Sequence, residues 1–108
     1  MKPRSDIHFE DFDAGRRDLA AVLAALDRPE HCLALLEDLT TPAELEALVD
    51  RWRVAQLLDQ GLPYREIHDR TGVSVTTIGR VARFIEMGHG GYRLALARLQ
   101  QSLQGSSE

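Results

Sequence analysis

The sequence contains little that would tie the chain to a membrane or to an oxidising compartment. It has one cysteine, Cys32, so no internal disulfide can form, and a reduced, cytoplasmic chain is the simplest interpretation. The longest uninterrupted apolar run, Leu19 to Leu26, is far shorter than the roughly 20 residues that a membrane-spanning helix requires. Lys2 and Arg4 are not followed by the apolar segment of a signal peptide. We therefore expect a small cytoplasmic protein with no membrane partner.

Ligand sets for metals and residue pairs for catalysis are also missing. His31 and Cys32 are adjacent, so on a helix their side chains point about 100° apart. The other histidines show no i, i+4 pairing with a second ligand: His8, His68 and His89. No nucleophile–base pair is evident, so we expect no metal, no cofactor and no enzymatic activity. One catalytic alternative stays open, in which Arg51 and Arg80 would hold an acidic substrate.

Charge is unevenly distributed along the 108 residues. Residues 1–50 contain 5 Lys or Arg and 12 Asp or Glu, a net charge of −7, whereas residues 51–108 contain 8 Arg and 5 Asp or Glu, a net charge of +3. The overall charge of −4 argues against a general nucleic-acid coat. Arginine, however, is suited to bidentate contacts with phosphate and guanine. The C-terminal half is therefore compatible with DNA binding, although composition alone does not prove it.

Apolar residues recur with the 3.6-residue period of helices and nowhere alternate for long with the period of strands. The pattern predicts an all-α fold of about six helices. The first contains the stripe that starts at Leu19, and the others run over residues 29–39, 42 to about 60, 63 to about 71, 75 to about 87, and 92–103. The clearest start is a capping box, in which Thr41 precedes Pro42 and Glu44 follows three residues after Thr41. Residues 9–103 are expected to form a single domain, with disordered tails over 1–8 and 104–108.

Residues 63–87 have the spacing of a helix-turn-helix, in which two short helices cross around a tight turn that contains glycine. Gly72 would adopt the left-handed turn conformation that a side chain resists. Ser74 would cap the second helix and leave the next residues pointing outward, as in a recognition helix that enters the major groove. Four apolar residues would form the small core between the two helices: Ile67, Val73, Ile78 and Val81.

The candidate DNA-contacting residues lie on both of these helices. Val75 and the methyl groups of Thr76 and Thr77 suit thymine methyl groups, and the hydroxyls can bond to bases or phosphates. His68, at a position that is usually small in this motif, is a further candidate on the first helix. Three arginines flank this surface and could hold phosphates or a guanine: Arg65, Arg80 and Arg83. A purely structural helix-turn-helix or a plain helical hairpin is the alternative.

Gly79 is unexpected inside the second helix, because glycine costs about 1 kcal/mol there relative to alanine. Close approach of DNA or of another backbone would explain it. Tight packing of helices within the protein would explain it equally well, so both interpretations stay open. We include Gly79 among the candidate DNA-contacting residues.

Several short motifs occur in order along the chain: Thr41-Pro42-Ala43-Glu44, Glu46-Ala47-Leu48 through Arg51, Arg65-Glu66-Ile67, Gly72, and Thr77-Ile78 with Arg80. With Arg83-Phe84-Ile85 and the Gly-His-Gly-Gly-Tyr segment at 88–92, they resemble the Trp repressor superfamily, and within it the YerC/YecD-type branch. The similarity covers about residues 15–100. It implies an all-α, intertwined homodimer whose two helix-turn-helix units bind a palindromic operator on double-stranded DNA, and hence a transcriptional regulator of the repressor type.

An argument from burial also favours a dimer. A chain of 108 residues with this many apolar stripes on short helices has difficulty burying them all alone. A compact monomer with one layered core is the alternative. A second functional alternative is a helix-turn-helix that contacts a protein of the transcription machinery; substitution of Arg65 or Val75 would then abolish function with no DNA affinity to lose.

The resemblance also implies a candidate ligand site. In the Trp repressor the indole of the co-repressor lies between two arginines, and the matching positions here are Arg51 and Arg80, with Thr41 matching a further pocket residue. Val81 and Phe84 stand where the repressor has a glycine and a serine, so they add bulk where the amino acid would lie. We expect these two side chains to fill the pocket and the protein not to bind tryptophan. An unknown small-molecule effector stays open.

Overall fold

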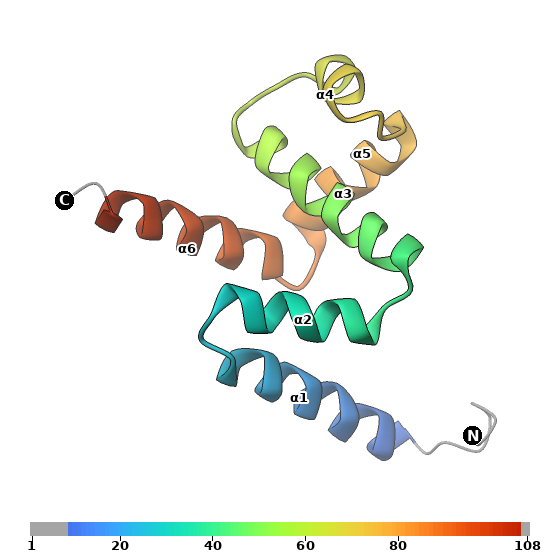
Figure 1. The fold of residues 1–108 in the computed structure, drawn as a ribbon. Coiled ribbons are helices and arrows are strands. Elements are labelled where there is room, and N and C mark those ends of the chain that lie inside the picture. The colour runs from blue at the N-terminus through green and yellow to red at the C-terminus, as the bar shows by residue number, and fades with distance from the viewer. Residues whose placement is uncertain (1–8, 107–108) are drawn as a thin grey trace. The chain divides into compact units, whose positions relative to one another are not determined.

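The computed structural model describes residues 9–106, with the side chains of residues 11–102. These residues form six helices and no strand (Figure 1), so the predicted all-α fold is confirmed. None of the described helices is long and apolar enough to cross a bilayer. The helices are α1 (Phe9–Ala25), α2 (Pro29–Leu39), α3 (Pro42–Asp59), α4 (Tyr64–Thr71), α5 (Val75–Met87) and α6 (Gly91–Ser106).

The observed helix ends differ from the predicted ones mainly at the two termini. Helix α1 starts at Phe9, well before the apolar stripe that begins at Leu19, because its first turns are supported by ion pairs rather than by apolar periodicity. Helix α6 ends at Ser106 rather than at Leu103, so residues 104–106 of the expected tail are helical. The rest of the two expected tails, residues 1–8 and 107–108, lies outside the described residues.

The chain divides into two compact units, one ending at Pro42 and the other starting at Ala43. In the first unit, the chain reverses direction between α1 and α2 (Figure 1). Asp13 pairs with Arg16 and, at 2.9 Å, with Arg17. The hydrogen bonds from Arg17 and Arg16 lower the pKa of the Asp13 carboxyl below its ordinary value. No described side chain of α1 or α2 is buried. The large apolar residues exposed on this unit are Phe12, Leu19, Val22, Leu33 and Leu39.

The second unit contains a small, well-buried core. The four residues predicted to lie between the two helices of the helix-turn-helix are all part of it, and α3 adds Val54 and Ala55. Val54, Ala55, Ile67 and Ile78 are completely inaccessible to solvent. Helix α3 is therefore the element on which α4 and α5 are held. Further side chains pack against this core from its edges: Trp52, Leu57, Leu58, Leu62, Ile85 and Tyr92.

Candidate nucleic-acid interface

Helices α4 and α5 form the predicted helix-turn-helix, joined by residues 72–74. Gly72 has a φ of +74°, the left-handed conformation expected for it, and its N–H donates to the His68 carbonyl over 2.8 Å. Ser74 then caps α5, because its hydroxyl oxygen accepts a hydrogen bond from the Thr77 N–H at 3.1 Å. The turn conformation and the cap together determine the direction in which α5 leaves the turn.

Side chains of α4 hold the turn by bonding to Val73. The Thr71 hydroxyl donates to the Ile67 carbonyl at 2.7 Å and accepts from the Val73 N–H at 3.1 Å. Nδ1 of His68 lies 2.7 Å from the Val73 carbonyl oxygen, and since a carbonyl only accepts, Nδ1 is the donor. His68 is itself exposed. Its observed contact is thus to the turn, and a DNA contact from its ring stays a prediction.

The outer face of α5 carries most of the candidate DNA-contacting residues. Val75 is 53% exposed, and Thr76, Arg80 and Arg83 are exposed as well. Thr77 differs from its neighbours, because it is half-buried and its hydroxyl oxygen accepts from the Ser74 hydroxyl at 3.1 Å. The Thr77 side chain is therefore engaged in the helix cap, whereas Val75 and Thr76 point their side chains to solvent.

The arginines of this region differ in whether their charge is compensated. Arg70 pairs with Glu66 at 2.7 Å, one turn apart on α4. Within the described side chains, no ion pair is formed by Arg65, Arg80 or Arg83. Their charges are available to an external anion, whereas that of Arg70 is neutralised locally.

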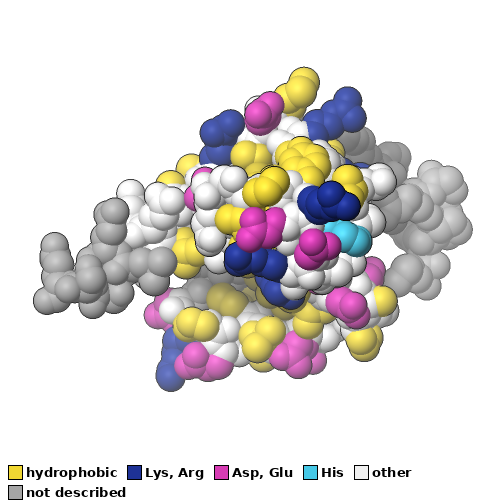
Figure 2. Space-filling view, turned by 90° about the horizontal axis from the view of Figure 1, so that it is seen from above, with side chains coloured by type: hydrophobic (Ala, Val, Ile, Leu, Met, Phe, Trp, Pro, Cys, Tyr) yellow, Lys and Arg dark blue, Asp and Glu magenta, His cyan; other side chains and the backbone are white. Residues whose placement is uncertain are grey.

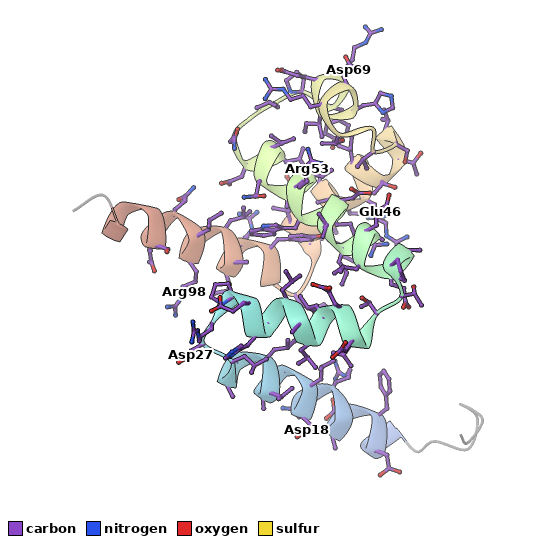
Figure 3. All side chains as sticks on the ribbon, in the orientation of Figure 1. Asp18, Asp27, Glu46, Arg53, Asp69 and Arg98 are labelled. Carbon is purple, nitrogen blue, oxygen red and sulfur yellow. The ribbon has the colours of Figure 1, made fainter. Side chains whose placement is uncertain are left out.

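Basic side chains do not form one continuous surface over this end of the molecule. Figure 2, which looks from the α4 end, shows acidic and apolar side chains between the basic ones. Asp69, for example, lies on α4 (Figure 3). Binding to phosphates would therefore depend on a few individually placed arginines rather than on a general positive field.

The space around Gly79 bears on one of its two interpretations, tight packing within the chain. A Cβ at Gly79 would have Tyr64 Cε2 as its nearest neighbour, at 3.8 Å, which is an ordinary van der Waals distance. Packing inside the described chain therefore does not require glycine here. Close approach of DNA or of another backbone from outside the described chain stays a prediction.

Arg51 and Arg80 line the same open groove, of about 510 Å³, between α3, α5 and the start of α6. The expectation that Val81 and Phe84 fill this space is wrong: Val81 is buried in the core, and Phe84, 45% exposed, lies at the side of the open groove. Thr41, the third residue of the expected ligand site, belongs to the first unit and immediately precedes α3. The remaining lining residues are Trp52, Gly88, His89, Gly91, Tyr92 and Ala95.

Comparison with known proteins identifies the family. Residues 16–100 match the family model of the Trp repressor protein, which is most of the chain. The chain belongs to the Trp repressor family. The resemblance inferred from the sequence motifs is thereby confirmed, and the family's fold is a regulatory, DNA-binding one.

Relatives within the Trp repressor family share most of the chain. The uncharacterized protein YerC of Bacillus subtilis is 37% identical over 78 residues, which cover 72% of this chain and 75% of YerC. The crystal structure of a candidate Trp repressor from Staphylococcus aureus superposes with a TM-score of 0.75 at 32% identity, covering 81% of this chain and 87% of that one. A TrpR-like protein from Eubacterium eligens superposes with a TM-score of 0.72 at 31% identity, over 78% and 87% of the two chains.

Two features of this Trp repressor family member were not predicted from the sequence. Trp52 lies both against the core and along the groove. Phe84 and Met87 extend the outer face of α5, where they line a second hollow of about 640 Å³ together with Thr76, Gly79, Arg80 and Arg83. Helical spacing could have revealed this second feature, because residues 76, 80, 83, 84 and 87 share one face of a helix.

Proposed function

We propose that this protein is a sequence-specific, DNA-binding transcriptional regulator that places α5 in the major groove of double-stranded DNA. One observation carries the proposal: exposed apolar and hydroxyl side chains at the start of α5 lie beside arginines that no described carboxylate neutralises. Recognition helices read base edges from these N-terminal positions. Membership of the Trp repressor family supports the same function.

The residues divide into those that position the protein and those that read sequence. Arg65 and Arg83 contact phosphates, which fixes the register of the protein on the duplex. Val75 and Thr76 read base edges, with Arg80 at their side, and Gly79 lets the backbone of α5 approach the groove closely. His68 and Thr77 act mainly through the turn and the cap that aim α5.

We further propose that the protein acts as a homodimer in which residues 9–103 of each chain form one helical domain. The exposed apolar residues of α1 and α2 have no core of their own, and the second unit exposes Leu48, Val49 and Leu94. Large apolar side chains exposed in such number are typical of association sites. In a symmetric dimer, two α5 helices about 34 Å apart would face successive major grooves, and the operator would be palindromic.

The mode of action that follows is steric. A cytoplasmic dimer that covers an inverted repeat excludes other proteins from it, so the simplest regulation is repression. Val81 and Phe84 stand where the repressor has a glycine and a serine, although they leave the groove of Arg51 and Arg80 open. From these two replacements we propose that DNA binding does not require tryptophan as co-repressor. Calorimetric titration with tryptophan tests this, and micromolar binding would contradict it.

The experiment that tests the main proposal is selection of duplexes from a random DNA library by the purified protein at physiological salt. Enrichment of an inverted repeat supports a dimer that reads sequence. Weak binding that depends on salt but not on sequence contradicts sequence recognition. In that case the alternative, contact with a protein of the transcription machinery, gains support if Arg65→Ala or Val75→Ala abolishes regulation without changing DNA affinity.

A further inference from the structure

The outer face of α5 contains an arginine stacked on an aromatic ring. The Arg80 Cζ atom lies 5.7 Å from the centroid of the Phe84 ring, one helical turn further along α5. A guanidinium within about 6 Å of a ring centroid is attracted by the negative face of the ring. Phe84 is 45% exposed, so its ring is not explained as part of the core.

Without the Phe84 ring, the Arg80 side chain could adopt several orientations. Within the described side chains, no ion pair holds the guanidinium of Arg80, and the Phe84 ring is the side chain over which it lies. Arg80 and Phe84 are also the two residues that line both the groove between α3, α5 and α6 and the hollow on the outer face of α5. A guanidinium on a flexible stem between two hollows can point into either one.

We propose that Phe84 is a positioning residue: its ring holds the Arg80 guanidinium in one orientation for DNA, without contacting the DNA itself. Less side-chain freedom is then lost when Arg80 binds, because the guanidinium is already ordered in the free protein. This inference rests on the proposed DNA-binding function. It assigns a role to a half-exposed aromatic side chain that neither the core nor the base-reading residues account for.

A double-mutant cycle tests the proposal, measured on the strongest duplex from the selection. Phe84→Ala should weaken binding by about 2- to 10-fold per recognition helix, the range expected for ordering one long side chain on binding, and so by about 4- to 100-fold for a dimer. In the Arg80→Ala background, Phe84→Ala should change nothing further. An equal loss in both backgrounds would overturn the proposal, because Phe84 would then act independently of Arg80.

Conservative variants of Phe84 separate the effect of its aromatic ring from the effect of its apolar volume. Phe84→Tyr keeps the ring and should bind as the unmodified protein does, whereas Phe84→Leu keeps only apolar volume and should lose as much affinity as Phe84→Ala. Full affinity in Phe84→Leu would overturn the role of the ring.

A measurement on the free protein tests the stack without DNA. The Arg80 side-chain protons should show upfield ring-current shifts by NMR in the unmodified protein and in Phe84→Tyr, and these shifts should disappear in Phe84→Leu. Their absence from the unmodified protein overturns the inference while leaving the proposed function untouched. Failure of the unmodified protein to bind any duplex overturns both, so the two failures are distinguishable.

Discussion

At the scale of single residues, Gly79 has opposite consequences for folding and for binding. Tyr64 Cε2 is 3.8 Å from the position of an added Cβ, so alanine fits into α5. Gly79→Ala should therefore stabilise the free protein by up to about 1 kcal/mol, because alanine is the better helix former. The same methyl group should weaken DNA binding, since in the proposed complex it stands where the backbone of α5 meets the major groove of the DNA. Urea unfolding and a binding titration check the two effects, and unchanged DNA affinity would contradict the second.

Arg83 is expected to contribute affinity without sequence preference. Arg83→Ala should weaken binding to all duplexes alike and reduce the slope of log affinity against log salt by about 1 per recognition helix, because one phosphate contact is lost. Arg98 is the matched control, since it is an exposed arginine on α6 rather than α5 (Figure 3). Titrations at several salt concentrations make the comparison. An unchanged slope in Arg83→Ala, or an equal change in Arg98→Ala, would rule out this phosphate contact.

Thr76 is expected to contribute sequence preference instead. Thr76→Ala should relax discrimination at one base step by about 1–3 kcal/mol, if its exposed side chain contacts a base directly. Thr77→Ala provides the contrast, because the Thr77 hydroxyl bonds to Ser74 and its loss should leave base preference intact. Competition between the selected operator and single-base variants measures both. Equal discrimination by Thr76→Ala and the unmodified protein would count against the assignment.

At the scale of elements, the helix-turn-helix depends on a cap that would also face the DNA in the proposed complex. Ser74→Ala should destabilise the protein by about 1 kcal/mol, since the Thr77 N–H loses its acceptor. Ser74→Asp should restore the stability, because a carboxylate caps well and is favoured at a helix N-terminus. It should nevertheless bind DNA more weakly, as it adds a negative charge beside the phosphates. Urea unfolding separates the variants, and equal stability of Ser74→Ala and the unmodified protein would be inconsistent with the observed cap.

At the scale of the whole molecule, the exposed apolar residues bear on association. Leu94 is 68% exposed on α6, so Leu94→Glu would be harmless on a free surface. In the proposed dimer it should give a monomer by analytical ultracentrifugation and bind the palindromic operator much more weakly. Val75→Glu is the control for the ultracentrifugation alone: Val75 is also an exposed apolar residue, but it lies at the start of α5, so this variant should remain a dimer. A dimer that persists in Leu94→Glu would exclude α6 from the interface.

Local signals in the sequence were sufficient for the helices and for the turn. Each signal acts over a few residues: Gly72 forms the left-handed turn, Ser74 caps α5, and the apolar residues up to Val81 follow the 3.6-residue period of a helix. These effects depend on neighbours along the chain, so they could be predicted. The apolar stripe from Leu19 gave no start for α1, since the first turns of this helix contain ion pairs such as Asp13–Arg17 rather than an apolar period.

Only the tertiary structure shows that the groove is open and that the Arg80 guanidinium lies over the Phe84 ring. Whether Val81 and Phe84 fill a pocket depends on how far α3, α5 and α6 stand apart, and no local signal specifies that distance. The same holds for Gly79, whose surroundings depend on where Tyr64 of α4 lies. The sequence by itself therefore determined the family, the six helices and the residues that α5 presents to solvent. Packing between elements distant in the sequence determined which of those residues share a hollow, because side-chain volumes are accommodated only once the helices meet.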